Sequence, residues 1–545
     1  MAPDAGPEGS PRFDRDAALA RLRAEPFDVL VIGGGVTGAG TALDAASRGM
    51  RTAIVERGDW ASGTSSKSSK LVHGGIRYLQ QREYRLVFEN LAERQHLLRN
   101  APHLVTELPF LIPLFGKDGV VNAAVAKGYT TALWLYDIVG GLRIGKAHRR
   151  ISPSAAVAHF PALRADRVAA AFLYYDARTD DARLTLALAR TAVLDHGAVA
   201  ANYAPVVSLL KSPAGRVTGA VLADGSEIRA ASVINATGVW ADDVRALDEG
   251  THPRSIRPAK GIHITVPAAR LPCDIAAVLP VPKDRRSIFV VPWGDETYVG
   301  TTDTDYDGPI DDPVATADDV AYLLDAVNTA TTAALTAADV VGAWAGLRPL
   351  VPHASSERTA DMSRRHQVHV ARSGLVTVTG GKLTTYRKMA ADAVDAITST
   401  RSRTRHLPLR GAIGLAYLRR PGAAARLGVT DAVLAHLLPR HGAEAPRVLA
   451  AVRDDPTLLE PLVPGLPYLR AEAVWAAREE MVVTLDDLLA RRTRALLRDR
   501  DATAAAAPAA AALVAPDLGW GTEGTTSQAA EFAAQVARER DGASR

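Results

Sequence analysis

Three glycines near the start of the chain have the spacing of a loop that binds a diphosphate. Gly33, Gly35 and Gly38 form the pattern G-x-G-x-x-G, directly after an apolar, β-branched run at 27–32 and directly before a helical segment at 39–48. The first glycine permits a tight turn, the second lets the backbone approach a diphosphate at the helix N-terminus, and the third lets helix and strand pack closely. The context therefore predicts a dinucleotide site rather than an ordinary glycine-rich turn.

A carboxylate follows at the spacing expected for a ribose ligand. Residues 52–56 have the pattern of a second strand, and Glu56 ends it. A strand, glycine loop, helix and second strand within about 30 residues indicate a parallel sheet with the dinucleotide at its edge. The alternative is a surface glutamate after an ordinary turn.

Two polar loops elsewhere carry the residue types of a binding site. Residues 65–78 combine serines and lysines with His73, and residues 380–387 combine two glycines with Lys382. The first loop follows the second strand directly, which favours an active-site loop over a flexible linker. A strand at 233–238 also ends in small residues, namely Ala236, Thr237 and Gly238.

Fixed positive charge in segments punctuated by Gly or Pro favours an anionic substrate. Arg77, Arg348 and Lys382 each lie in such a segment. Arginine binds phosphate through two parallel N–H donors, so this set is suited to a phosphorylated substrate. In an arginine-rich chain, the alternative for each residue is a solvated surface charge.

Histidine is the usual residue for proton transfer near neutral pH. His73, flanked by Gly74 and Gly75, is the first candidate for a general base, and His263 competes with it. A single histidine is more often packed or hydrogen-bonded than catalytic, so both alternatives stay open. Thr302, which follows a predicted strand, either contacts substrate or simply ends that strand.

Taken together, these segments resemble the FAD-dependent glycerol-3-phosphate dehydrogenase family. The resemblance covers residues 27–400 in family order and continues more weakly over 478–494. It implies an α/β fold, in which a Rossmann-like FAD-binding domain and an antiparallel-sheet substrate domain, like that of D-amino-acid oxidase, precede a helical C-terminal domain. The matching segments are G-G-G-V-T-G-A-G, S-S-K-L-V-H-G-G-I-R-Y-L, V-I-N-A-T-G, G-T-T-D-T, G-L-R-P-L and G-G-K-L-T-T-Y-R-K.

The resemblance also implies a reaction and roles for residues in these segments. FAD would accept a hydride from sn-glycerol 3-phosphate, which becomes dihydroxyacetone phosphate, and a quinone would take the electrons. The expected catalytic residues are His73, Arg348 and Lys382. Substrate contacts are expected from Arg77, Tyr78, Thr302, Arg348 and Lys382, and cofactor contacts from Gly33, Gly35, Gly38, Glu56, Ser65, Ser66, Ser69, Ala236, Thr237, Gly238, Gly381 and Leu383.

Three other functions remain open at this point. An oxidase would pass the electrons to oxygen and release hydrogen peroxide. A D-amino-acid or glycine oxidase would share the core, but the cluster of cations favours a phosphate over an amino acid. A non-catalytic flavin-binding protein would not need His73, Arg77, Arg348 and Lys382 together, so their joint presence argues against it.

Composition narrows the class of protein. A chain of 545 residues suggests two or three domains, and 47% hydrophobic with 23% charged residues is typical of a globular protein. The formal charge of +4 comes from 64 basic and 60 acidic residues, a balance too even to favour nucleic acid. The single cysteine, Cys273, excludes an internal disulfide and a cysteine-rich metal site held by this chain alone, and no metal is expected.

The pattern of elements changes at about residue 400. Residues 1–26 are predicted to be a partly disordered leader, 27–400 to hold the interleaved FAD-binding and substrate domains, and 401–545 to form a helical domain with a disordered tail. No segment has the pattern of a transmembrane helix or signal peptide. We expect a cytoplasmic homodimer that contacts the inner face of the membrane peripherally, through residues 129–150 or 478–498.

The sequence also predicts further strands and helices beyond the first unit. Strands are predicted at 206–210, 217–222, 227–234, 287–291, 297–300 and 375–379, and helices at 84–99, 180–195 and 383–398.

Overall fold

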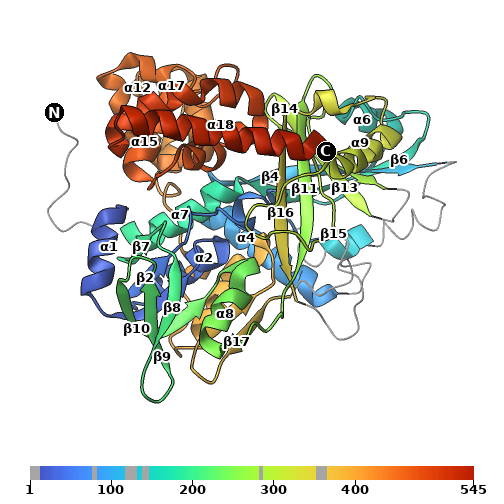
Figure 1. The fold of residues 1–545 in the computed structure, drawn as a ribbon. Helices are drawn as coiled ribbons and strands as arrows, with labels where there is room; N and C mark the ends of the chain where they lie inside the picture. The colour runs from blue at the N-terminus through green and yellow to red at the C-terminus, as the bar shows by residue number, and fades with distance from the viewer. Residues whose placement is uncertain are drawn as a thin grey trace.

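The computed structural model divides the strands between two sheets and places a group of helices at the C-terminal end (Figure 1). It describes residues 13–76, 83–116, 132–137, 146–281, 286–351 and 365–544. The first sheet has eight strands and the second has ten. This arrangement confirms the α/β class with mixed sheets and a helical C-terminal domain.

The first sheet contains the predicted β-loop-α-β unit. Its central strands pair in parallel, β18 with β10, β10 with β1, β1 with β2 and β2 with β7, while β17 pairs antiparallel with β18 at the edge. β1 and β2 are almost wholly buried, as expected for strands covered on both faces. The strands are β1 (Phe27–Ile32), β2 (Thr52–Val55), β7 (Val199–Ala201), β8 (Val206–Lys211), β9 (Val217–Leu222), β10 (Glu227–Asn235), β17 (Gln367–Val370) and β18 (Val376–Thr379).

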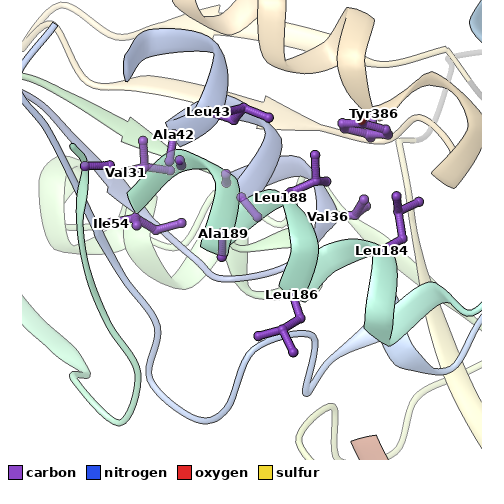
Figure 2. Close-up of a cluster of buried hydrophobic side chains, with 14 of the residues drawn as sticks. Val31, Val36, Ala42, Leu43, Ile54, Leu184, Leu186, Leu188, Ala189 and Tyr386 are labelled. Atoms are coloured by element: carbon purple, nitrogen blue, oxygen red, sulfur yellow. The ribbon is translucent and has the colours of Figure 1, made fainter. Parts of the chain in front are cut away.

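Three helices far apart in the sequence share one core with this sheet. They are α2 (Val36–Ser47), α7 (Asp181–Leu194) and α10 (Tyr386–Asp395). Figure 2 shows Val31 and Ile54 of the sheet beside side chains of α2 and α7, with Tyr386 close by. A Cβ at Gly40 would lie 2.7 Å from the Tyr386 ring, so α2 and α10 approach closely because this position is glycine.

The second sheet is antiparallel except where β12 pairs with β4. Successive residues of β4 enter two different cores, which places helices on both faces: Leu111 packs with α6 (Pro153–His159) and α9 (Ala317–Ala330), and Phe110 packs with α4 (Tyr84–Asn100). The strands are β3 (Leu71–Val72), β4 (Val105–Phe115), β5 (Arg149–Ile151), β6 (Val168–Thr179), β11 (Arg257–Pro267), β12 (Ala276–Pro280), β13 (Ser287–Trp293), β14 (Glu296–Gly300), β15 (Thr304–Asp305) and β16 (Gly342–Leu350).

The C-terminal helices pack on one another and against the first sheet's helices (Figure 1). α18 ends beside α9 of the second sheet, with Ala543 against the core that α9 shares. The main helices are α13 (Asp431–His441), α15 (Arg470–Glu479), α17 (Arg500–Leu518) and α18 (Thr522–Ser544), and the shorter ones are α11 (Leu415–Leu418), α12 (Ala423–Arg426), α14 (Ala445–Val448) and α16 (Ala495–Arg498).

The C-terminal tail, which the sequence predicts to be disordered, is helical as far as Ser544, and α18 buries Phe532 and Val536 in a core shared with α15 and α17. Within the predicted leader, α1 (Arg15–Ala24) buries Leu22, and residues 1–12 lie outside the described part of the chain.

One of the two predicted membrane-contact stretches lies inside the protein. Within 478–498, Leu485, Leu488 and Arg494 are each buried to 1% exposure or less, so this segment packs between the C-terminal domain and the sheets. The other stretch, 129–150, is described only at 132–137 and 146–150. Over the residues that the structure describes, no helix is both long and apolar enough to cross a membrane.

Candidate active site

A cavity of about 420 Å³ lies where the strands of the first sheet end, and we call it the dinucleotide cavity. Such an edge of a parallel sheet is where dinucleotides bind, and nine of the predicted cofactor residues line the cavity. They are Gly33, Gly35, Glu56, Ser65, Ala236, Thr237, Gly238, Gly381 and Leu383, and Lys382, predicted for the substrate, lines it as well.

The glycine loop has a shape that only glycine permits. Gly33 has a φ of +112°, and a Cβ there would lie 2.7 Å from the carbonyl oxygen of Ala236. A Cβ at Gly38 would lie 1.8 Å from the carbonyl oxygen of Gly33, so Gly38 supports the loop and does not line the cavity. Gly35 is the residue that caps α2, and it leaves the N-terminal end of that helix open to the cavity.

Two side chains complete this cradle. Glu56 accepts hydrogen bonds from the N–H groups of Gly34 (2.6 Å) and Gly58 (2.8 Å), and burial raises the pKa of its carboxyl group. The Ser65 hydroxyl accepts a hydrogen bond from the Val36 N–H at 2.8 Å, at the start of α2. A carboxylate at the end of β2 can accept hydrogen bonds from ribose hydroxyls, and a hydroxyl at the helix N-terminus lies where a diphosphate binds.

A second cavity of about 380 Å³ adjoins the first, and we call it the cationic cavity. The two share part of their lining, namely Thr64, Pro349, Gly381, Lys382 and Leu383. The predicted residues His73, Thr302, Arg348 and Lys382 line the cationic cavity, together with Ser69, which was predicted for the cofactor. One long ligand could therefore pass from the glycine loop to the edge of the cationic cavity.

Arg348, on β16, is held by three hydrogen bonds. Its guanidinium donates to the carboxylate of Asp303 (3.2 Å), the hydroxyl of Thr301 (3.0 Å) and the carbonyl of Thr302 (3.1 Å). On the neighbouring strand, a Cβ at Gly261 would lie 2.3 Å from the guanidinium, so glycine makes room for it. The sequence indicated the segment 301–303 as a possible part of the substrate pocket, but it did not predict that Asp303 pairs with Arg348 or that Gly261 makes room for the guanidinium.

Arg286 is a further cation that the sequence did not single out. It lines the cationic cavity and donates to the backbone carbonyl of Asp303 at 2.6 Å. Asp303 therefore connects two arginines, through its carboxylate to Arg348 and through its carbonyl to Arg286. With Lys67 and Lys382, four Lys and Arg side chains and one carboxylate line the same space, which gives it a net positive charge suited to a dianion.

The two candidate histidines both line the cationic cavity but differ in burial and partners. His73 is half-buried in the cationic cavity, with its backbone N–H bonded to the Thr384 hydroxyl (3.2 Å) and its ring edge-on to Phe289. His263 is 2% exposed, stacks on Trp344 at 4.8 Å between ring centres, and pairs with the Ser69 hydroxyl at 2.9 Å. Burial, and then the charges of Lys70 and Arg348, hold the pKa of His263 well below its usual range.

Two of the described site residues, Ser66 and Thr302, have hydrogen bonds that direct them toward the protein interior. Ser66 lies behind the loop and lines neither cavity, and its carbonyl accepts a hydrogen bond from Arg494, so the predicted cofactor contact through its side chain is not seen. The Thr302 hydroxyl accepts from the backbone N–H of Ile262 at 3.1 Å, which ties it to β11. Arg77 and Tyr78 lie outside the described residues. In the described part of the chain, no group of His, Cys, Asp and Glu could hold a metal ion.

Comparisons with known proteins agree with this geometry. The family model for FAD-dependent oxidoreductases matches residues 28–387, and the model for the C-terminal domain of alpha-glycerophosphate oxidase matches 402–525. The chain is 41% identical to glycerol-3-phosphate dehydrogenase 2 of Mycobacterium tuberculosis over 99% of this chain and 94% of the relative. It is 38% identical to the human mitochondrial glycerol-3-phosphate dehydrogenase over 93% of this chain and 72% of the relative.

A solved structure has the same fold over nearly the whole chain. The glycerol-3-phosphate dehydrogenase of Bacillus halodurans, complexed with FAD, has a TM-score of 0.77 and 33% identity over 96% of each chain. The cradle described above fits this cofactor, since its glycines leave the helix N-terminus open and Glu56 lies at the end of β2. The chain therefore belongs to the family of FAD-dependent glycerol-3-phosphate dehydrogenases.

Proposed function

We propose that this protein oxidises sn-glycerol 3-phosphate to dihydroxyacetone phosphate, with FAD as the first electron acceptor. The observation that supports this most directly is the cationic cavity, which adjoins the dinucleotide cavity and carries Arg286, Arg348 and Lys382. A phosphate dianion offers several acceptor oxygens, and arginine donors match their geometry. The names of the relatives above point to the same substrate.

The orientation of Arg348 supports its role as a phosphate ligand. Three partners hold its guanidinium at one end, and Asp303 neutralises only part of the local positive charge. An arginine held in this way loses little freedom when a phosphate binds. Arg77 and Tyr78, from the matching segment 65–78, remain proposed substrate ligands.

Oxidation at carbon 2 removes a hydride and the hydroxyl proton. FAD, when bound, supplies the acceptor for the hydride. His73 is the proposed base for the proton, because it is half-buried within the cationic cavity, whereas His263 is buried, bonded to Ser69 and of lowered basicity. Lys382 and Arg348 would stabilise negative charge that develops on the substrate oxygen.

The visible spectrum of the purified holoenzyme tests this function. In the absence of oxygen, glycerol 3-phosphate should reduce the flavin and bleach its absorption, at a rate close to the rate of enzyme turnover. Glycerol, which lacks the phosphate, and glycine, the substrate of the related amino-acid oxidases, should leave the spectrum unchanged. A flavin that stays oxidised with glycerol 3-phosphate, or that glycine reduces instead, would refute the proposal.

The final electron acceptor is proposed to be a quinone. An oxidase that releases hydrogen peroxide is the second candidate, because residues 402–525 match a domain model named for alpha-glycerophosphate oxidase. Enzyme that glycerol 3-phosphate has reduced in the absence of oxygen should be reoxidised rapidly by a soluble quinone analogue and slowly by air-saturated buffer. One peroxide per substrate, with no quinone reduction, would establish the oxidase instead.

A cytoplasmic location is also proposed, and a quinone acceptor would then bring the protein into peripheral contact with the inner face of the membrane. Aromatic side chains on two neighbouring helices could provide that contact, since Trp134 is 57% exposed, Phe88 50% and Tyr84 49%. Leu133 and Tyr136, beside Trp134, pack in one core with α4, which carries the other two. Trp134→Ser should reduce the co-sedimentation of the protein with lipid vesicles that contain a quinone. The same variant should reduce its flavin in solution at the wild-type rate. Unchanged co-sedimentation would exclude this surface as the membrane contact.

A homodimer is also proposed, and sedimentation velocity would test it.

A further inference from the structure

A buried arginine connects the C-terminal domain to the loop that lines the cationic cavity. Arg494 is 1% exposed and lies between the helices of the C-terminal domain and residues 66–70. One nitrogen of its guanidinium donates to the carbonyl of Ser66 at 2.5 Å and to the carboxylate of Asp181 at 2.9 Å. The other terminal nitrogen donates to the carbonyl of Ala490 at 3.1 Å, within the C-terminal domain itself.

Asp181, at the start of α7, carries this connection further along the loop. Its carboxylate accepts from the backbone N–H (3.0 Å) and the hydroxyl (2.7 Å) of Ser68 and from the ammonium of Lys70 (3.4 Å). Arg494 and Asp181 therefore bind residues 66, 68 and 70 from behind. All of these partners are buried except Ser68, so water does not replace them readily.

The front of the same loop faces the active site. Ser69 bonds to His263, and Lys70 lies over the ring of Trp344 at 4.5 Å, the ring on which His263 stacks. The chain then runs through β3 to His73. Burial, followed by the charge of Arg494, lowers the pKa of Lys70 to about 8, so Arg494 acts on this loop through its charge as well as through its contacts.

The backbone of Arg494 also departs from the usual conformation. Its φ is +70°, in the left-handed region that residues with a side chain rarely adopt. A residue keeps such a conformation where the surrounding contacts determine it, and such residues cluster at functional sites. The change of direction follows the π-helical turn Asp487–Arg492, at the residue whose side chain bonds to Ser66 and Asp181.

We propose that Arg494 is a positioning residue, through which the C-terminal domain holds residues 66–70, and with them Ser69 and His73, in the geometry that substrate oxidation requires. This inference rests on the proposed function. It assigns the C-terminal domain a part in flavin reduction, although none of its described residues lines the cationic cavity. Lys67 and Ser68 of this loop also line the cationic cavity, but the proposed phosphate ligands Arg286, Arg348 and Lys382 are on other segments. The loss of Arg494 should therefore affect the rate of oxidation more than substrate affinity.

A buried arginine on α7 provides a matched control. Arg190 is 3% exposed and pairs with Glu444 of the C-terminal domain through two hydrogen bonds of 2.6 and 3.2 Å. Like Arg494, it links this domain to the rest of the protein, but its hydrogen bonds and its contact with the Trp475 ring are all directed to the C-terminal domain rather than to residues 66–70. Arg190→Met should therefore destabilise the domain contact while leaving the loop in place.

The experiment measures anaerobic flavin reduction by glycerol 3-phosphate in Arg494→Met, Arg494→Lys and Arg190→Met holoenzymes. We expect Arg494→Met to lower the limiting reduction rate at least tenfold with an apparent dissociation constant within threefold of wild type. Arg494→Lys should recover part of the rate, and Arg190→Met should reduce at the wild-type rate. Equal rates for Arg494→Met and Arg190→Met, or a change confined to the dissociation constant, would overturn the proposal.

A milder variant tests the same connection if Arg494→Met does not fold. Ser68→Ala removes one hydrogen bond to Asp181 from the loop side and should slow reduction severalfold. A wild-type rate in Ser68→Ala would then count against the proposal. Failure of the proposed function itself is distinguishable, because in that case the wild-type flavin would not be reduced by glycerol 3-phosphate at all.

Discussion

Arg348→Met removes the best-oriented cation of the cationic cavity while keeping a side chain of similar length. The structure gives the guanidinium three partners within the protein, so its direction is fixed before a ligand binds. A hydrogen bond to a charged group contributes about 1.5–3 kcal/mol. Since about 1.4 kcal/mol corresponds to a factor of ten, the dissociation constant for glycerol 3-phosphate should rise about 10- to 150-fold.

The assay is anaerobic stopped-flow reduction of the flavin over a range of substrate concentrations, which separates affinity from the limiting rate. Arg257→Met is the control, because Arg257 lies on the adjacent strand β11 and pairs with the exposed Asp305 at the surface. It should change affinity less than twofold. If Arg348→Met binds substrate within twofold of wild type, the phosphate is not bound by Arg348 and the reasoning fails.

Three further predictions concern the cofactor, the base and the domain contact. Gly38→Ala should yield protein without FAD, seen as loss of absorbance near 450 nm, because the added Cβ would lie 1.8 Å from the Gly33 carbonyl; full FAD content would contradict the loop geometry. His73→Gln should slow flavin reduction about 10²- to 10⁴-fold, and a smaller effect would favour another base. Burial, then the charge of Arg183, lowers the pKa of His441 to about 4 in the folded protein, so the unfolded chain binds more protons between pH 6.5 and 4. The contribution of His441 to the free energy of unfolding, about 3 kcal/mol, should be present above pH 6.5 and lost as the pH falls toward 4. In urea unfolding, the free energy of unfolding of His441→Gln should therefore fall less between pH 6.5 and 4 than that of the wild type.

Local patterns in the sequence were enough to predict the elements nearest the cofactor. β1, β10 and α7 lie within two residues of their predicted positions, because buried parallel strands and amphipathic helices have strong periodicity. The long strands β4 and β6 were not predicted, since each contributes to cores on both sides of the second sheet and lacks a simple alternating pattern.

Contacts between distant segments were beyond the reach of local patterns. Asp303 approaches Arg348 only because β11 pairs with both β15 and β16. The sequence could not indicate that Ser66 faces away from the cofactor, because its direction depends on Arg494, more than 400 positions further along the chain. The order of α18 likewise comes from the burial of Phe532 and Val536 on other helices rather than from its own composition.

The parallel sheet also determines how early the fold can be completed while the chain is being synthesised. β1 and β2 emerge early, but β10 must arrive from mid-chain and β18 with α10 only after residue 376, when more than half of the chain has been made. At roughly 5–20 residues per second, the glycine loop waits tens of seconds for the strands and helix that cover it. The nascent N-terminal half therefore exposes apolar strands without their partners, and it should depend on ribosome-associated chaperones until α10 packs against α2.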